Sequence, residues 1–411
     1  MSKLKTIALV EWNWKGHHPA EFNRFVLALE DAGANVLALC ANPAEAEATA
    51  NATRPAAGTG TGPRGKTVFA RVRCANRRFF KLRPHRISMI DWAIRHFRGI
   101  EAQACGLAGE VGQKVDAIFY ACVYDFDFEW VRYAQPFLRL PWAGLYLHAL
   151  SYRMRGQPNP YSGRLPCPEK MFSTRLCKGI FILDEEIVDQ VSRSIGKPVV
   201  VLPDVDDMRM PVRENERALG DRLAAFAAGR PVVGLFGHLQ KSKGLMVFLE
   251  AARKLAEVPV CFALGGEMDW PAEEGEKRQI CRILAECPHA WTHLLRIPEE
   301  TQMNYLLSKC DVLYAGYMDF PHSSGIMSKA AALRKPLIVS DGYLMANRAR
   351  RFKLGEIIPQ GNVAALVDAI QKLAQDTGAW KAANHPRWNE YCEEHAFARF
   401  KAGVQNLLNF V

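Results

Sequence analysis

Short apolar runs alternate with helix-patterned segments along the chain. "TIALVEW" at 6–12 has the composition of a buried strand, and "PAEFNRFVLALEDAG" at 19–33 carries apolar residues at helical spacing. "NVLALCA" at 35–41 is again strand-like. Because parallel strands are joined by crossover helices that cover both faces of their sheet, this alternation predicts an α/β protein with doubly wound sheets.

The alternation forms two blocks. Further strand candidates of the first block lie at 116–123, 142–150, 179–183 and 198–203, and those of the second at 231–237, 259–266, 292–297, 311–316 and 336–342. A chain of 411 residues exceeds a single core, so we expect two domains. Their predicted bounds are 1–205 and 206–385, with an amphipathic helix in 386–411 after the break at Pro386.

Residues 43–66 interrupt the first block. They are small and polar with several glycines and prolines, a composition that predicts a mobile insertion without structure of its own. Eleven cysteines are scattered without a CxxC pair, which predicts reduced, mostly buried thiols and neither a zinc site nor a disulfide framework. The apolar runs are strand-sized, and the N-terminus has no cleavage site, so we expect a cytoplasmic protein.

The net charge of +10 is uneven, because residues 1–205 carry 27 Lys and Arg against 19 Asp and Glu. The excess is densest at 71–98, where nine basic residues face one acid and large apolar residues, among them Phe79, Phe80, Trp92 and Phe97, stand between them. This mixture predicts peripheral contact with an anionic membrane, with the rings below the headgroups. The alternatives are a solvated basic face around a core helix and, less favoured, nucleic-acid binding, which we do not expect.

The segment "SSGIMSKAAALRKPLIVSDG" at 323–342 predicts a helix followed by a buried strand. The helix should begin near Ser324, with its first amides unpaired beside Ser323, Gly325 and Ile326. Such a helix start favours a phosphate site. The alternative is an ordinary capped helix.

Three longer stretches, at 232–266, 304–342 and 354–376, resemble in order and spacing the donor half of GT-B glycosyltransferases. The likeness is to the retaining, nucleotide-sugar-dependent enzymes of family four. It implies two Rossmann-like domains facing a central cleft, and a C-terminal helix that crosses back to the first domain. It also implies a UDP-, GDP- or ADP-linked sugar as donor and a carbohydrate or lipid-linked acceptor, with no tightly bound cofactor and no required metal.

The resemblance assigns the donor site residue by residue. In "GHLQKSKG", from Gly237 to Gly244, Lys243 matches the diphosphate clamp and would also act in catalysis by stabilising the leaving group. His238 stands where the family has Arg, and His238 or Lys241 is implied as a weaker second diphosphate contact. The alternative for Lys243 is a surface lysine before a glycine cap. "LLRIPEE" matches the segment that contacts the base, which implies Arg296 and Ile297 beside it.

The family has two glutamates separated by seven residues in the segment that corresponds to 323–342, and both are absent here. Aligning the two sequences at Lys335 and Pro336 places Lys329 at the second, ribose-binding glutamate and Pro321 or His322 near the first. The resemblance therefore implies a divergent branch in which the mouth at Ser323, Ser324, Gly325 and Ile326 still binds phosphate and Ser323, Ser324 or Asp319 replaces the acids. The rival interpretation is a donor-binding protein or scaffold without transfer.

The first domain supplies the acceptor side in this resemblance. The candidates are His17 and His148 as catalytic residues, Gly16 beside the donor, and His18, Asp125 and Asp127 as substrate-binding residues. The alternatives are helix caps and packed core residues. The implied reaction retains configuration without a protein nucleophile, the leaving diphosphate taking the acceptor proton. Sugar-nucleotide epimerases and phosphorylases share the fold, but an epimerase needs acids placed for proton transfer and a phosphorylase a larger chain.

Overall fold

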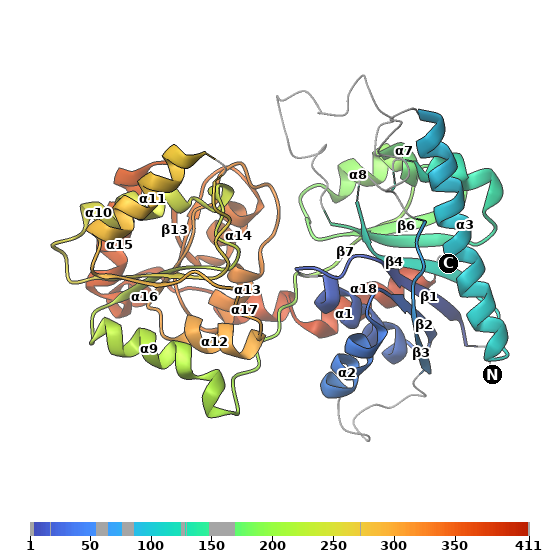
Figure 1. The fold of residues 1–411 in the computed structure, drawn as a ribbon, viewed down its shortest axis with the longest axis horizontal. Helices are drawn as coiled ribbons and strands as arrows, with labels where there is room; N and C mark the ends of the chain where they lie inside the picture. The colour runs from blue at the N-terminus through green and yellow to red at the C-terminus, as the bar shows by residue number, and fades with distance from the viewer. Residues whose placement is uncertain are drawn as a thin grey trace. The chain divides into compact units, whose positions relative to one another are not determined.

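The computed structural model describes residues 4–16, 18–54, 65–75, 86–124, 128, 130–147, 169–271 and 273–409 (Figure 1). The chain divides into two compact units. The first contains Met1–Pro203 together with Phe397–Val411, and the second contains Asp204–Ala396.

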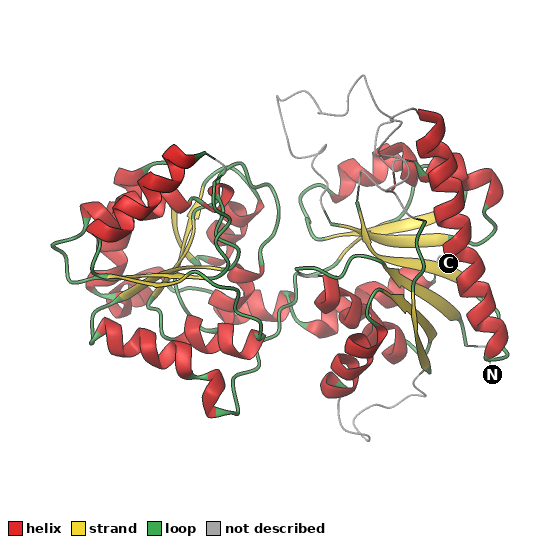
Figure 2. Ribbon diagram, viewed as in Figure 1, coloured by secondary structure: helices red, strands yellow, loops and turns green. Residues whose placement is uncertain are grey.

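A parallel sheet of seven strands forms the centre of the first unit, in the order β3-β2-β1-β4-β5-β6-β7. Its strands are β1 (Thr6–Glu11), β2 (Asn35–Cys40), β3 (Thr67–Arg71), β4 (Ala117–Val123), β5 (Trp142–Tyr146), β6 (Cys177–Ile182) and β7 (Val199–Val201). The helices are α1 (His18–Asp31), α2 (Pro43–Thr53), α3 (Arg86–Glu110), α5 (Val131–Ala134), α7 (Glu169–Phe172), α8 (Val188–Ile195) and α18 (Phe397–Leu408). Figure 2 shows helices on both faces of this sheet, as the buried β1 and β4 require.

The second unit has a parallel sheet of six strands in the order β10-β9-β8-β11-β12-β13. Its strands are β8 (Val232–Phe236), β9 (Cys261–Gly265), β10 (Ala290–His293), β11 (Val312–Ala315), β12 (Leu337–Ser340) and β13 (Gly355–Ile358). The helices are α9 (Ala218–Ala227), α10 (Leu245–Lys254), α11 (Glu274–Glu286), α12 (Glu300–Ser308), α13 (Gly325–Ala332), α14 (Leu344–Phe352), α15 (Val363–Gln375), α16 (Thr377–Asn384) and α17 (Trp388–Glu394).

Each sheet has one point where the strand order reverses. In the first unit this switch point lies between β1 and β4, and in the second it lies between β8 and β11. Open parallel sheets bind their ligands beyond the carboxyl ends of the strands at such a point, because the helices that follow the two strands leave on opposite faces. The loops after these four strands are therefore where the sites of both units are expected.

The predicted doubly wound sheets are confirmed, and the structure adds one strand to each. β3 and β13 were missed because both lie at a sheet edge and are half-buried, so neither has a long apolar run. The strand predicted at 292–297 was wrong in position. β10 covers Ala290–His293, where the buried Trp291 fixes it to the core.

Residues 43–53 fold as α2, in contrast to the expected insertion without structure. Pro43 stands in the first turn of the helix, and the buried Ala46 and Ala50 give α2 a packed face that small residues form without a conspicuous apolar pattern. Residues 55–64 of that segment lie outside the described residues.

The C-terminal segment consists of two helices that belong to different units. α17 lies in the second unit, where Trp388 and Tyr391 join its core, and α18 belongs to the first, where Phe400 contacts Phe25 with ring centroids 5.0 Å apart. Lys401 on α18 pairs with Asp31 at 2.9 Å. The chain thus passes from one unit to the other at 395–397, about one helix later than the break at Pro386 suggested.

The basic segment 71–98 is described only in part. Trp92 and Phe97 of α3 are buried in the first unit's core, so the expectation that these two rings enter a membrane was wrong. Their helical spacing reflects the packing of α3 on its sheet. Phe79 and Phe80 lie outside the described residues. Among the described helices, none is long and apolar enough to span a bilayer.

Candidate functional site

The loop after β8 is held tightly against the end of β11. Gly244 precedes α10 with φ 72°, and a Cβ at this position would overlap the carbonyl oxygen of Gly316 and the hydroxyl of Tyr314. Only glycine combines this backbone conformation with such a close approach. The Met318 N–H donates to the Ser242 carbonyl at 2.7 Å, which ties the two loops together on the other side.

Lys243 points its amine into this corner. Its Nζ lies 5.1 Å from the centroid of the Tyr317 ring, a cation–π distance. A Cβ at Gly237, which follows β8 with φ 103°, would lie 3.0 Å from the same nitrogen. The two glycines therefore leave room for the lysine side chain at the carboxyl ends of β8 and β11.

The other basic residues of this turn are engaged elsewhere. Lys241 is exposed and forms a 2.8 Å ion pair with Glu276, and His238 lies 3.7 Å from Asp269. In the part of the chain that the structure describes, no carboxylate lies within ion-pair distance of Lys243. Lys243 is therefore the cation of this turn that is best placed to meet an anionic ligand.

The first turn of α13 opens close to the same corner. Ser324 is its N-cap residue without a side-chain cap, and the Ser324 hydroxyl lies 3.4 Å from that of Tyr317. Tyr317 thus connects Lys243 to the helix start. The leading N–H groups of a helix have no intrahelical partner and carry partial positive charge, so the amides of Gly325 and Ile326 extend the positive region formed by Lys243.

Two aspartates of the segment that enters the second unit contact this helix start. Ser323 donates to Asp204 at 2.6 Å and accepts from the buried Arg348 at 2.7 Å. Asp206 packs against Gly325, where a Cβ would overlap its carboxylate oxygen. The Ser323 hydroxyl is therefore engaged inside the protein, and the backbone amides of Gly325 and Ile326 remain as donors at the start of this helix.

Lys329 is buried one turn further along α13. Its Nζ lies 3.1 Å from Asp206, 2.7 Å from Glu300 and 2.8 Å from the Asn304 side-chain oxygen. Burial alone lowers the pKa of Lys329, but the attraction of Asp206 and Glu300 outweighs it and the pKa is raised. The charged lysine therefore fastens the segment around Asp206 to α12 and α13.

The remaining predicted donor-side residues lie in loops. Arg296 is exposed, and Ile297 is half-buried, in the connection between β10 and α12. Asp319 is exposed after β11 with φ 46°, and its N–H donates to Gln360 at 2.8 Å. No hydrogen bond or ion pair among the described residues joins Arg296, Ile297 or Asp319 itself to Lys243, so their roles remain predictions.

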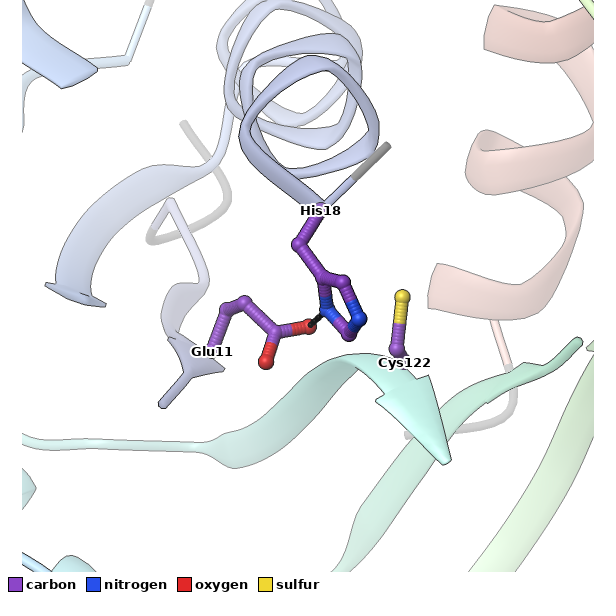
Figure 3. A group of neighbouring side chains, drawn as sticks. All are labelled: Glu11, His18 and Cys122. Atoms are coloured by element: carbon purple, nitrogen blue, oxygen red, sulfur yellow. Dashed lines mark ion pairs between the residues drawn. The ribbon is translucent and has the colours of Figure 1, made fainter. Parts of the chain in front are cut away.

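In the first unit, three buried side chains meet at the switch point of the sheet. Glu11 ends β1, His18 begins α1 and Cys122 lies in β4 (Figure 3). One possible ligand atom from each residue lies within 4.8 Å of the other two. The three groups are a carboxylate, an imidazole and a thiol, and zinc accepts all three as ligands in proteins. However, burial raises the pKa of the Cys122 thiol well above its usual range, whereas metal coordination requires the thiolate.

The ring nitrogens of His18 face different partners. Nδ1 lies 2.9 Å from Glu11, and Nε2 lies 2.9 Å from the Tyr124 hydroxyl and 3.0 Å from the Asn13 side-chain nitrogen. This arrangement assigns the proton to Nδ1 and makes Nε2 the acceptor. The predicted substrate-binding residue His18 is therefore almost fully buried, with polar groups of the protein close to both ring nitrogens.

Other predicted acceptor-side residues cannot be placed in this geometry. Gly16 adopts φ 60° in the loop before α1. His17, Asp125, Asp127 and His148 lie outside the described residues, so their roles remain predictions.

Sequence reasoning missed Glu11, Tyr124 and Tyr317. Each closes or follows an apolar strand, where it resembles a core residue. Their position at the carboxyl end of a strand could have identified them, because polar groups at the carboxyl ends of parallel strands gather at one edge of the sheet.

Comparison with known proteins agrees with the resemblance seen in the sequence. Residues 223–393 match the family described as Glycosyl transferases group 1. The match covers less than half of the chain. Lys243, Tyr317 and the start of α13 all lie within it, whereas the first unit lies outside the match. No curated protein matches the chain by sequence.

Solved structures resemble this chain over nearly its whole length. Anabaena HepE in complex with UDP and glucose covers 100% of both chains with a TM-score of 0.65 at 12% identity. Sucrose-phosphate synthase from Thermosynechococcus elongatus has a TM-score of 0.62 at 16% identity and covers 98% of each chain. WaaG, a glycosyltransferase involved in lipopolysaccharide biosynthesis, has a TM-score of 0.61 at 10% identity and covers 98% of this chain and 99% of its own. The fold is GT-B, as predicted.

We expect Lys329→Met to destabilise the protein by about 3–5 kcal/mol, because removing one partner of a buried ion pair leaves Asp206 uncompensated. Denaturant unfolding measures this loss. Lys372→Met is the matched control, since Lys372 pairs with Glu356 on the surface at 57% exposure and should cost less than about 1 kcal/mol. Because the pKa of Lys329 is raised in the folded protein, its contribution to stability is fully present below pH 10.5. The contribution is lost only as the pH rises through the pKa of Lys329 in the folded state.

Lys329→Glu tests the same arrangement in the opposite direction. It places a third carboxylate beside Asp206 and Glu300, so we expect lower stability and no gain in nucleotide affinity. A stable variant that binds nucleotide more tightly would show that the side chain at position 329 faces the ligand and not the segment around Asp206.

Proposed function

We propose that this protein transfers a sugar from a nucleoside-diphosphate sugar to a carbohydrate or lipid-linked acceptor, with retention of configuration. The observation that carries the proposal is the position of Lys243, whose amine lies over the Tyr317 ring next to the start of α13. An ammonium and a helix N-terminus at a switch point together suit a diphosphate.

The donor is best sought first among uridine nucleotides. HepE was solved in complex with UDP and with UDP-glucose, which supports UDP-linked sugars as the first class to test, with GDP- and ADP-linked sugars as alternatives. We place the base near Arg296 and Ile297 and the sugar near Asp319, as the sequence resemblance implies.

The chemistry follows from where negative charge develops. As the bond between the anomeric carbon and the diphosphate breaks, charge grows on the leaving oxygen, and Lys243 with the α13 amides would stabilise it. Removing one preorganised donor from the oxyanion hole of a protease costs about 3–4 kcal/mol, which sets the scale expected here. The proposal needs no protein nucleophile, and Lys243 and the α13 amides supply the positive charge for which a metal would otherwise serve.

Lys243→Ala should weaken UDP binding roughly 10- to 100-fold, because a charge-assisted hydrogen bond contributes about 1.5–3 kcal/mol. It should nearly abolish transfer. Titration calorimetry with UDP measures the affinity, after a thermal-shift panel of UDP, GDP and ADP has chosen the base. Lys241→Ala is the matched control and should bind as the parent does, since Lys241 pairs with Glu276. Equal affinities for both variants would remove Lys243 from the site.

Tight UDP binding without any turnover of sugar nucleotides would favour the rival function, a protein that binds a donor but does not transfer it. No binding of any nucleotide would instead favour a scaffold of the same fold.

We further propose that the basic segment 71–98 lies against an anionic membrane at the inner face, which would bring the enzyme to a lipid-linked acceptor. Replacing Arg77, Arg78, Lys81 and Arg83 by Ser should lower binding to phosphatidylserine vesicles strongly, at about 1 kcal/mol per basic residue. Vesicle sedimentation measures it, and UDP affinity should not change. Equal sedimentation of variant and parent would show that the segment is a solvated face.

A further inference from the structure

Three metal-ligating side chains meet within the first unit, at the switch point of its sheet. Glu11 ends β1, His18 begins α1 and Cys122 lies in β4, so three elements each contribute one group (Figure 3). In the described part of the chain, this is the set of His, Cys, Asp and Glu side chains that comes close enough together to hold a metal ion. The set shares no residue with the donor-binding corner around Lys243 and lies outside residues 223–393.

The three side chains are removed from water. Glu11, His18 and Cys122 are each 3% exposed. A polar group that loses its hydration in the interior needs bonds within the protein or to a bound ion, and a buried charge is either paired or coordinated to a metal. Exposed acidic groups are common without a metal, whereas this set is buried and combines three different ligand types.

The distances suit a tetrahedral ion after a small adjustment. His18 Nδ1 lies 2.9 Å from a Glu11 oxygen, and one possible ligand atom of each of the three residues lies within 4.8 Å of the other two. Zinc bonds of about 2.0 Å to oxygen and nitrogen and about 2.3 Å to sulfur place tetrahedral ligand atoms roughly 3.5 Å apart. Side-chain shifts of about 1 Å are therefore sufficient to form the bonds.

Outer partners hold two of the three ligands in place, as is usual around metal ions in proteins. The Asn13 N–H donates to the second Glu11 oxygen at 2.8 Å. His18 Nε2 lies 2.9 Å from the Tyr124 hydroxyl, which can accept a hydrogen bond from Nε2–H when Nδ1 binds a metal. The carboxylate and the imidazole are thus oriented by groups that do not themselves belong to the set.

The charges of the set balance those of a divalent cation. An ionised Glu11 and a Cys122 thiolate carry two negative charges, and His18 binds a metal as the neutral ring. The nearby Glu21 is paired with Arg24. Burial raises the pKa of the Cys122 thiol in the metal-free protein, but a coordinated metal ion displaces the thiol proton. The burial of Cys122 therefore weakens metal binding without preventing it.

We propose that the first unit binds a zinc ion through a Glu11 carboxylate oxygen, His18 Nδ1 and Cys122 Sγ. On binding, the S–H bond of Cys122 breaks, the sulfur keeps the electron pair and donates it to zinc, and the proton leaves to solvent. The ring proton of His18 moves from Nδ1 to Nε2, and no atom is oxidised or reduced. Three protein ligands leave the fourth position of a tetrahedral ion to water.

The ion would fasten β1, α1 and β4 to one another at the carboxyl edge of the sheet. No step of the proposed sugar transfer passes through it. The site departs from the sequence-based expectation of no zinc site, which rested on the lack of CxxC pairs. Its ligands come from distant parts of the sequence, and the strand order, with β1 beside β4, brings them together.

Cobalt, which accepts the same ligands and is coloured, is the probe for this site. After treatment with EDTA, the full chain should bind about one equivalent of Co²⁺ and develop a thiolate-to-cobalt charge-transfer absorption. Cys122→Ala should lose this absorption and bind Co²⁺ more than about 100-fold more weakly, because even the outer partners of metal ligands contribute 10- to 100-fold. Cys177→Ala is the matched control, since Cys177 is a buried thiol of β6 in the same unit, and it should behave as the parent does.

A second measurement addresses His18 in the protein with its native thiol. In nitrogen-15 spectra of labelled histidine, with His18 assigned by comparison with His18→Gln, Zn²⁺ should shift the Nδ1 resonance and leave the proton on Nε2. Zn²⁺ should also raise the melting temperature of the parent and of Cys177→Ala, but not that of Cys122→Ala.

A parent protein that shows no thiolate-to-cobalt absorption would overturn the proposal, whether or not the variants fold. Persistence of the absorption in Cys122→Ala, or a His18 ring that Zn²⁺ does not affect, would overturn it as well. None of these measurements uses a nucleotide sugar, so their outcome is independent of the proposed transfer reaction.

Discussion

The donor-side site depends on the close approach of two backbone segments at Gly244 and Gly316. Because no side chain fits between them, the turn after β8 lies directly against the loop after β11. That contact sets the Lys243 amine over Tyr317 and brings Tyr317 to the first turn of α13. One steric constraint thus assembles a cation, a ring and a helix start from three parts of the sequence.

A charge network around the buried Lys329 supports this assembly. Lys329 on α13 joins Asp206 from the entering segment to Glu300 on α12. Its desolvation is unfavourable by itself, and the two carboxylates together compensate for it. The sequence resemblance placed a ribose-binding acid at this position, but the structure gives the lysine a role in fastening α13. Any ribose contact has to come from elsewhere in the site.

The sequence was sufficient to predict the fold because the central strands of both sheets are continuous apolar runs. It failed at β3 and β13, since edge strands are half-buried and lose that pattern. Lys243 was predicted from its glycine-flanked turn. The sequence could not show that Lys241 is paired whereas Lys243 is not. The partner of Lys241 is Glu276, which lies too far along the chain for a local pattern to reveal the pair.

The first unit shows the same limit. A helix start at His18 follows from the residues around it, but Glu11 is the last residue of an apolar strand and Tyr124 follows another. Nothing in the local sequence distinguishes either from a core residue. Only the strand order, with β1 beside β4, brings them to one histidine.

Hydrogen–deuterium exchange with and without UDP tests the central claim most directly, namely that the corner of Lys243, Tyr317 and α13 binds the diphosphate. The account predicts slower exchange of the amides from Gly237 to Leu245 and from Tyr317 to Met327 when UDP is bound, because the phosphates contact those backbone groups. Protection confined to other segments, with these two unchanged while UDP is bound, would contradict it.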